Sequence, residues 1–253
     1  MTSICIIPAR GGSTRIKNKN TREFLGKPVL AYSIEAAEAA GIFDRITVNT
    51  EDDRIGGLVS QLGATFYKRP PELATDLVPM VDVILEQLET MERKGLTYDA
   101  VCMVYACAPL ITPKLLIDGY NRIELGYDVV FPIVEGPHIE NTMFIRNQRL
   151  LNRFPEYENE NSQLWTDAYY HAGMFFWARV DSLEGARSFN LPNRWGVIVP
   201  AHRAQDIDTP EDWALAEMKY KAAHNYVSID DDRLTLMTPE ERQAWATTKE
   251  KGD

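Results

Sequence analysis

The sequence predicts an α/β protein in which a mostly parallel sheet is flanked by helices. The first observation is the regular alternation of short apolar runs and helical segments from residue 4 to residue 134. Such alternation requires right-handed crossovers, which cover both faces of a parallel sheet with helices. The second is a glycine-rich, cationic loop directly after the first apolar run, where α/β folds present ligands. At 253 residues the chain is long enough for one large domain with a substantial core.

The first part of the chain contains three predicted strands. An apolar run of β-type residues predicts a strand over 4–8. Residues 29–40 are expected to form a helix, because Pro28 suits a first helical turn and Gly41 a C-terminal cap. We further expect a strand over 45–50, a helix over 51–62 that ends at Gly63, a strand over 64–67 and a rigid proline loop at 69–72.

The middle of the chain repeats this pattern. Apolar residues recur at helical spacing between 79 and 94, and an uninterrupted apolar run at 100–105 predicts a strand buried on both faces. Pro113 begins a further predicted helix that ends at Gly126, and residues 128–134 are expected to form the next strand.

The alternation stops between about 137 and 170, where the sequence is polar, aromatic and irregular. We interpret this stretch as an insertion that reaches over the site or pairs with a second subunit. Further strands are expected at 173–179 and 196–200, and a helix from 210 to about 224. Residues 1–227 are therefore predicted to form one domain, with 228–253 as a loosely held C-terminal tail.

Composition argues against several classes of partner. The chain has 37 acidic and 27 basic residues, a net charge of −10 and a sequence pI near 5.0, so nucleic acid is not expected as a main partner. No apolar run approaches the roughly 20 residues that span a bilayer, and no secretory signal pattern is recognised, so we expect no membrane association. Cys5, Cys102 and Cys107 are interpreted as reduced thiols, which indicates a cytoplasmic protein.

The loop after residue 8 carries the first functional signal. Gly11 and Gly12 let backbone N–H groups approach phosphate oxygens, and Ser13 adds a hydroxyl. The cations that can neutralise phosphate charge are Arg10, Arg15, Lys17, Lys19 and Arg22. The pattern matches neither the Walker loop nor G-x-G-x-x-G, which weakens the ATPase and dinucleotide interpretations. A solvated basic turn is the alternative, and we favour a phosphate-binding site.

Asp206 and Asp208 form the second signal. In an extended segment, residues two apart share a face, so both carboxylates project together while Ile207 is buried opposite. Two carboxylates combined with phosphate oxygens and water suit Mg²⁺, which we expect at this pair. Alternatively, Asp208 only caps the helix that begins at Thr209 and Pro210, and the two roles are compatible.

The segment from Tyr105 to Pro109 forms the third signal. It follows the central strand at its C-terminal end, where an open α/β sheet presents a ligand-facing loop. A tight turn forced by Pro109 explains Cys107 equally well. Cys107 is not expected to be a nucleophile, because no histidine partner is evident in the sequence.

Together these motifs resemble the CMP-sialic acid synthetase family. The resemblance covers residues 3 to 222 in order and spacing, and it rests on Ile-Pro-Ala-Arg-Gly-Gly-Ser at 7–13, Lys19-Asn20, Gly26-Lys27-Pro28, Tyr105 to Pro109, Ala172-Gly173-Met-Phe-Phe-Trp177 and Gln205-Asp-Ile-Asp-Thr-Pro-Glu-Asp-Trp213. It implies a Rossmann-like nucleotidyltransferase fold with a small dimerisation insertion, and a homodimer. It also implies a Mg²⁺-dependent enzyme of cell-surface glycan biosynthesis that joins CTP to a nine-carbon nonulosonic acid and releases pyrophosphate. Within the family, the likeness is greatest to the branch that activates pseudaminic acid.

The resemblance also assigns roles to individual residues. Arg10, Lys19, Asp206 and Asp208 would be catalytic, with both aspartates as metal ligands. The nucleotide would be bound by Ala9, Arg10, Gly11, Gly12, Ser13, Arg15, Lys19, Asn20, Asp76 and Ala106. The sugar would be bound by Tyr105, Cys107, His171, Gly173, Phe175 and Gln205. The candidates for binding its carboxylate are Lys27, Arg69 and His171, and no side chain is indicated as the general base.

Several positions depart from the family pattern. Thr14 stands where a lysine is usual, with Arg15 next to it, and Lys and Arg are not equivalent at phosphates. His171 and Met174 replace an aspartate and a glutamine beside the presumed sugar. Legionaminic, N-acetylneuraminic and 3-deoxy-manno-octulosonic acids are therefore alternative substrates. The alternative of another class is a non-catalytic nucleotide-binding or assembly subunit, against which the two retained aspartates argue.

Overall fold

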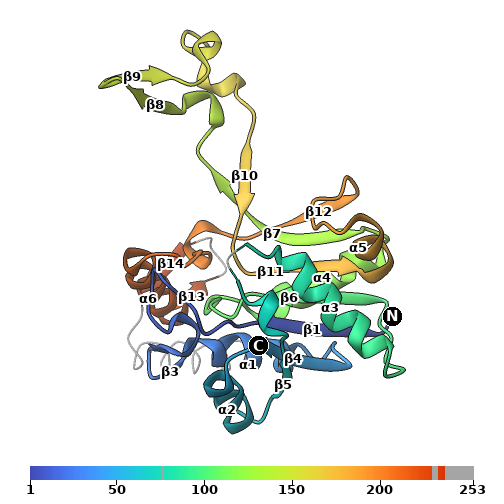
Figure 1. Cartoon of the computed structure of the whole chain (residues 1–253). Helices are drawn as coiled ribbons and strands as arrows, with labels where there is room; N and C mark the ends of the chain where they lie inside the picture. Colours follow the sequence, from blue (N-terminus) through green and yellow to red (C-terminus); the bar gives the residue numbers. More distant parts are fainter. Residues whose placement is uncertain (76, 230–232, 237–253) are drawn as a thin grey trace, which may run out of the picture.

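A computed structural model describes residues 1–75, 77–229 and 233–236 of the chain. The centre of this described part is an eight-stranded sheet with the strand order β5-β4-β1-β6-β11-β7, in which β10 and β12 also pair with β7 (Figure 1). The parallel strands are β1 (Ser3–Pro8), β4 (Arg45–Thr50), β5 (Thr65–Lys68), β6 (Ala100–Val104), β7 (Val129–Gly136) and β12 (Arg194–Ile198). β10 (Ala168–His171) and β11 (Phe175–Arg179) run antiparallel to β7. The predicted mostly parallel sheet is confirmed.

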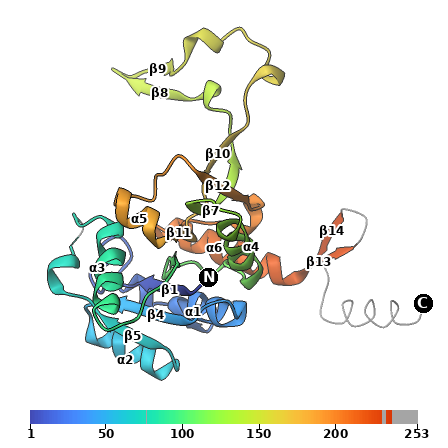
Figure 2. The same ribbon diagram turned by 90° about the vertical axis from the view of Figure 1, so that its right-hand side faces the viewer.

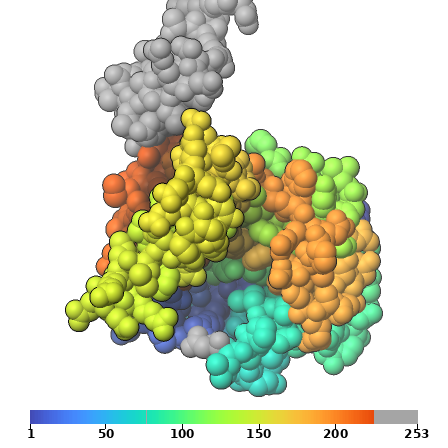
Figure 3. Space-filling model, turned by 90° about the horizontal axis from the view of Figure 1, so that it is seen from above, coloured from blue at the N-terminus to red at the C-terminus, as the bar shows by residue number. Residues whose placement is uncertain are grey.

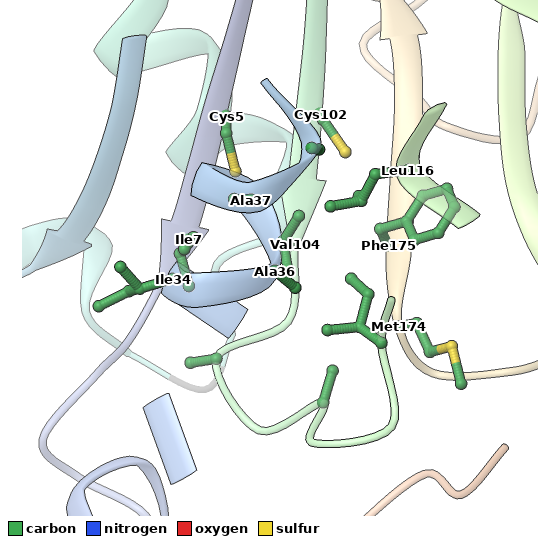
Figure 4. Close-up of a cluster of buried hydrophobic side chains, with 14 of the residues drawn as sticks. Cys5, Ile7, Ile34, Ala36, Ala37, Cys102, Val104, Leu116, Met174 and Phe175 are labelled. Carbon is green, nitrogen blue, oxygen red and sulfur yellow. The ribbon is translucent and has the colours of Figure 1, made fainter. Parts of the chain in front are cut away.

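Helices cover both faces of this sheet. They are α1 (Val29–Ala40), α2 (Asp53–Gln61), α3 (Met80–Glu92), α4 (Pro113–Glu124), α5 (Val180–Ala186) and α6 (Pro210–Asn225). On one face, α1, α2 and α4 pack over Cys5 and Ile7 of β1, and Figure 4 shows Ile34 of α1 near Ile7 in this layer. On the other face, α3 and α5 pack over Ile4 and Ile6. Alternate residues of β1 therefore face opposite layers, which is why its apolar run is continuous.

The predicted helix boundaries follow from the expected caps. α1 ends at Ala40 and is capped by Gly41, which adopts the left-handed conformation with φ of 63°. Pro113 is the first residue of α4, and the Thr112 side chain accepts a hydrogen bond from the Leu115 N–H. The short helix α5 is not among the predicted elements; it lies directly after β11 and buries Leu183.

The strand order places two loops side by side. The chain runs from β1 to β4 and β5 on one side of the sheet, and then returns to β6 on the other side of β1. The C-terminal ends of β1 and β6 therefore lie at the point where the order reverses, and ligands bind at this point in open α/β sheets. The glycine-rich loop follows β1, and the segment that begins at Tyr105 follows β6.

Residues 137–170 form an arm that projects away from the sheet from the ends of β7 and β10 (Figures 1 and 2). The arm is not irregular throughout, because β8 (Met143–Arg146) and β9 (Arg149–Asn152) pair as an antiparallel hairpin. Its two turn residues, Asn147 and Gln148, both have positive φ. Hairpin turns of this kind usually contain glycine, so the sequence lacks the usual hairpin signal. Three 3-10 turns complete the arm: η3 (Ile139–Asn141), η4 (Pro155–Tyr157) and η5 (Ser162–Leu164).

The remaining elements are short. They are η1 (Lys19–Thr21), β2 (Glu23–Phe24), β3 (Lys27–Pro28), η2 (Pro71–Leu73), η6 (Ala201–Arg203), β13 (Tyr226–Ile229) and β14 (Arg233–Leu236). β13 and β14 pair antiparallel after α6. Most of the predicted tail, residues 230–232 and 237–253, lies outside the described residues, as does Asp76. Among the residues that are described, no helix is both long enough and apolar enough to cross a membrane.

Candidate active site

Two pockets lie at this edge of the sheet and share Asp208 in their walls. The first, here called the cationic pocket, is lined by Arg10, Ser13, Thr14, Arg15, Lys19, Asn20, Arg69, Met80 and Asp208, among others. The second, here called the acidic pocket, is lined by Val134, Tyr170, His171, Ala172, Ala204, Gln205, Asp206, Asp208, Asp212 and Lys219. Figure 3 shows blue N-terminal residues in a hollow between the yellow arm and the cyan segment.

The glycine-rich loop is held in place by its neighbours. The Asn20 side chain donates a hydrogen bond of 3.0 Å to the Arg10 carbonyl, and the Gly11 N–H donates one of 2.8 Å to Glu51 Oε1. A Cβ atom on Gly11 would lie 2.1 Å from Asp52 Oδ2, so only glycine fits at this position. Gly11 therefore serves close packing against Asp52, whereas Arg10, Ser13, Arg15, Lys19 and Asn20 line the cationic pocket as predicted nucleotide ligands.

Arg69 is a member of the cationic pocket that the predicted nucleotide ligands do not include. Its side chain is buried, its Nε donates to Asn49 Oδ1 over 2.5 Å, and its Nη2 donates to the Asn49 carbonyl over 2.9 Å. Burial lowers the pKa of Arg69, and Glu51, whose Oε2 is 3.9 Å from Nη1, opposes that shift. The signal that could have found it is its place directly after β5, at the same edge of the sheet as the loop.

The aspartate pair adopts the predicted alternation. Ile207 is buried, Asp206 is exposed and Asp208 is half-buried. The cations of the loop contact this segment: Arg15 Nη1 lies 2.8 Å from Asp208 Oδ2, and Lys19 Nζ lies 3.5 Å from Asp208 Oδ1. Lys19 also donates a hydrogen bond to the Ile207 carbonyl. Two motifs that are almost 200 residues apart in the sequence thus form one charged cluster.

The helix-capping interpretation of Asp208 is wrong. The Thr209 hydroxyl accepts a hydrogen bond of 3.2 Å from the Asp212 N–H, while Asp212 Oδ2 accepts one of 2.8 Å from the Thr209 N–H. This reciprocal pair is a capping box for α6. The Asp208 carboxylate therefore has no capping role and faces both pockets.

The donor set at the aspartates fits a divalent cation that also binds phosphate. Among the described residues, no group of three or more His, Cys, Asp or Glu side chains is arranged to hold a metal ion by itself. Within the same residues, the Asp206 carboxylate forms no hydrogen bond or ion pair. A carboxylate pair that needs further oxygen ligands from phosphate and water is the arrangement that Mg²⁺ prefers.

His171 lines the acidic pocket with an imidazole whose two nitrogen atoms both face the protein. Its Nδ1 accepts a hydrogen bond of 3.1 Å from the Gly173 N–H, and its ring stacks on Phe176 with centroids 4.4 Å apart. Burial lowers the pKa of His171, partly offset by Asp206. The imidazole is therefore neutral near pH 7 with its proton on Nε2, a buried atom without a partner among the described residues.

Gly173 and Tyr105 support the pocket from behind. Residues 172–174 separate β10 from β11, and Gly173 has φ of 69°. A Cβ atom there would lie 2.7 Å from the Asp206 Cβ and Cγ. Tyr105 is half-buried with its ring 5.9 Å from His171, and burial raises its pKa to about 12, with Asp206 and Asp208 adding to the effect.

Other predicted ligands are not among the residues that line either pocket. Ala106 and Cys107 are buried, and Cys107 packs with Ile16 and Trp213. Burial raises the pKa of the Cys107 thiol to about 12, which agrees with the expectation that it is not a nucleophile. Ala9 and Phe175 are buried in the core, and Gly12 does not line the cationic pocket. Lys27 pairs with Glu35 and lies over the Tyr32 ring. The roles given to these residues stay predictions.

A cationic loop and a carboxylate pair at the switch point of a mostly parallel sheet define a nucleotidyltransferase-type α/β protein. The chain belongs to the cytidylyltransferase family, whose model matches residues 4–131. The predicted family resemblance is confirmed.

Two relatives of this chain carry the name of an acid. It is 32% identical over 228 residues to the pseudaminic acid cytidylyltransferase of Campylobacter jejuni subsp. jejuni strain 81-176, which covers 88% of this chain and 98% of that protein. It is 27% identical over 226 residues to the CMP-N,N'-diacetyllegionaminic acid synthase of Legionella pneumophila. That alignment covers 86% of this chain and 95% of that protein. The structure of a CMP:2-keto-3-deoxy-manno-octonic acid synthetase complexed with CTP aligns with a TM-score of 0.65 at 19% identity. That alignment covers 88% of this chain and 99% of the other. This last likeness confirms the fold.

Proposed function

We propose that this chain transfers the cytidylyl group of CTP to a nonulosonic acid, with pseudaminic acid as the preferred substrate, and releases pyrophosphate. The observation that carries the proposal is the shared wall of the two pockets at Asp208. A reaction that joins a triphosphate to a sugar needs one site for each, in contact at the reacting atoms. The Campylobacter relative, which aligns over nearly the whole of both chains, supports the choice of acid.

The reaction proceeds by attack of the anomeric hydroxyl of the acid on the α-phosphorus of CTP. The bond from that phosphorus to the α,β-bridging oxygen breaks, pyrophosphate leaves with that oxygen, and the proton of the attacking hydroxyl is released to water. The protein aligns the two reactants and stabilises charge on the phosphate oxygens. Arg10, Arg15, Lys19 and Arg69, which line the cationic pocket, bind the triphosphate.

Asp206 and Asp208 are the residues that would hold Mg²⁺. When bound, the ion supplies Lewis-acid polarisation of phosphate oxygens. Arg15 and Lys19 pair with Asp208 from the loop side, so they hold this carboxylate between the two pockets. Asp208→Ala should abolish turnover with little change in fold, because the half-buried side chain leaves the capping box of α6 intact.

A second copy of the chain is the proposed partner of the arm. The arm exposes large apolar side chains, namely Ile139, Met143, Ile145, Leu150, Leu151 and Leu164. Met143, Ile145 and Leu150 share one face of the β8–β9 hairpin, because Ile145 pairs with Leu150 and Met143 lies two residues from Ile145. Apolar side chains gathered on one surface indicate an interaction site. We therefore expect a homodimer in which this surface is covered. We also expect the enzyme in the cytoplasm, since its three cysteines are unpaired and buried.

The test is pyrophosphate release from CTP and Mg²⁺ with pseudaminic, legionaminic, N-acetylneuraminic and 3-deoxy-manno-octulosonic acids. We expect release with pseudaminic acid, lost in Asp208→Ala. Faster release with another acid would keep the reaction and replace the substrate. If CTP binds but no acid gives pyrophosphate, the chain is a non-catalytic nucleotide-binding subunit and the proposal is wrong.

A further inference from the structure

The acidic pocket contains a cation that the predicted site does not include. Among the described residues that line it, Lys219 of α6 is the only lysine or arginine, beside Asp206, Asp208 and Asp212. A nonulosonic acid has its carboxylate on the anomeric carbon, which also bears the attacking hydroxyl. The substrate carboxylate must therefore lie close to the three aspartates, where like charges repel it unless a cation is present.

Among the residues that the structure describes, no counter-ion neutralises the charge of Lys219. Its Nζ donates to the Ala204 carbonyl over 2.6 Å and to Gln205 Oε1 over 3.0 Å, and both acceptors are neutral. In the described part of the chain it forms no ion pair. An ammonium group has three hydrogens, so one remains for a ligand. Partial burial of a charge without a partner is costly, and it lowers the pKa of Lys219.

Hydrogen bonds fix this ammonium beside the proposed metal ligands. Gln205 accepts from Lys219 and donates to Asp212 Oδ1 over 3.1 Å, and it directly precedes Asp206 in the chain. Asp212 in turn belongs to the capping box that begins α6. Hydrogen bonds through Gln205 therefore connect Lys219 to Asp212 and to the backbone carbonyl of Asp206.

We propose that Lys219 binds the carboxylate of the acid substrate and so selects α-keto acids over neutral sugars. This inference rests on the proposed function. The candidates named from sequence are less suitable: Arg69 lines the cationic pocket and Lys27 is paired with Glu35. His171 lines the same pocket, but its Nε2 atom is buried and its Nδ1 accepts from the Gly173 N–H.

The test compares Lys219→Met with Lys221→Met, a matched control on an exposed position of the same helix. Pyrophosphate release gives the KM for the acid and for CTP. The neutral C1 carboxamide of the acid is measured as a competing ligand, so it does not need to react. We expect Lys219→Met to raise the KM for the acid about 10- to 100-fold, the range for a hydrogen bond to a charged group. The KM for CTP should stay the same, and the preference for acid over carboxamide should disappear.

Each other outcome has a distinct meaning. Equal increases in the KM for acid and CTP, or an unchanged preference for acid over carboxamide, would show that Lys219 only holds residues 204–205, and the inference would be overturned. If the wild-type chain releases no pyrophosphate with any acid, the proposed function fails first and this inference with it. If Lys219→Met does not fold, Lys219→Gln decides by the same measurements, because it keeps a neutral donor near the Ala204 carbonyl and removes only the charge.

Discussion

Arg15 Nη1 lies 2.8 Å from Asp208 Oδ2, so a cation of the glycine-rich loop is ion-paired with a proposed metal ligand near the end of the domain. The pair is mostly exposed to solvent and contributes little to stability. Its importance is positional, because it brings a phosphate-binding cation to the wall that both pockets share.

Arg15→Gln should weaken CTP binding without unfolding the protein. The loss of one charged hydrogen bond to phosphate predicts a KM for CTP that rises roughly 10-fold or more, with a melting temperature close to that of the wild type. Lys17→Gln is the matched control, since Lys17 is exposed in the same loop and lines neither pocket. An equal KM in the two variants would remove Arg15 from the nucleotide site.

Gly173→Ala should reduce turnover through Asp206. The backbone at Gly173 has φ of 69°, and an added Cβ would lie 2.7 Å from the Asp206 side chain. Displacement of a catalytic group by about 1 Å can cost roughly 100-fold in rate. Gly26→Ala is the control, because Gly26 has φ of 96° with nothing within 4 Å of a Cβ. Both variants should lose about 1–2 kcal/mol of stability, and only Gly173→Ala should lose turnover. Equal kcat values would contradict this.

Gln87→Leu should disturb the cationic pocket through the buried residues that support Arg69. Gln87 of α3 is fully buried, donates to Thr47 Oγ1 over 2.8 Å and accepts from Asn49 Nδ2 over 2.8 Å. Asn49 in turn holds the Arg69 guanidinium. Unsatisfied Asn49 and Thr47 should lower the free energy of unfolding by about 1–3 kcal/mol, measured in urea, and the KM for CTP should rise. The control is Gln61→Leu at an exposed end of α2. A normal KM for CTP in Gln87→Leu would show that the hydrogen bonds of Gln87 do not support CTP binding.

Asp52→Asn should make the stability of the fold depend less steeply on pH at acid pH. The Arg54 side chain, hydrogen-bonded to Asp52 Oδ2 over 2.6 Å, holds the pKa of Asp52 below its usual range. The unfolded chain therefore takes up this proton at a higher pH than the folded chain. Stability from Asp52 is present above the unfolded pKa and is lost as pH falls through the lower folded pKa. Thermal unfolding between about pH 4 and pH 2.5 should show a shallower loss in Asp52→Asn than in the wild type or in Asp53→Asn, whose side chain is 89% exposed.

Ile145→Glu combined with Leu150→Glu should separate the proposed dimer. These residues are paired across the β8–β9 hairpin and are 76% and 65% exposed. Charges on both would oppose burial of the arm against a second copy. In sedimentation at micromolar concentration, the wild type should have twice the mass of the 28.8 kDa chain. The double variant should have the mass of one chain. Leu125→Glu, at a 70% exposed position after α4, is the control. A monomeric wild type would exclude the dimer.

Much of the fold was predictable because its signals are local. Strand and helix boundaries are set within a few residues by the apolar run that ends at Pro8, by the cap Gly41 and by Pro113 in a first helical turn. The arm hairpin was not predictable in this way, since Asn147 and Gln148 form its turn without glycine. The glycine-rich loop and the aspartate pair could also be predicted from the sequence. The positions of these residues along the chain set the directions of their side chains.

The sequence by itself determined the fold class, the family and the two charged motifs, since each depends on residues that are neighbours along the chain. Only the tertiary structure decided which cations share a pocket. Arg69 follows β5 and Lys219 belongs to α6. Strand order brings Arg69 to the loop, and hydrogen bonds to the Ala204 carbonyl and to Gln205 hold Lys219 in the acidic pocket with Asp206. Phe175 shows the converse: the family resemblance implies a ligand, and the pleat of β11 directs its side chain into the core. Pairing between distant segments leaves no periodic trace in one sequence, so the pockets could be assembled only in three dimensions.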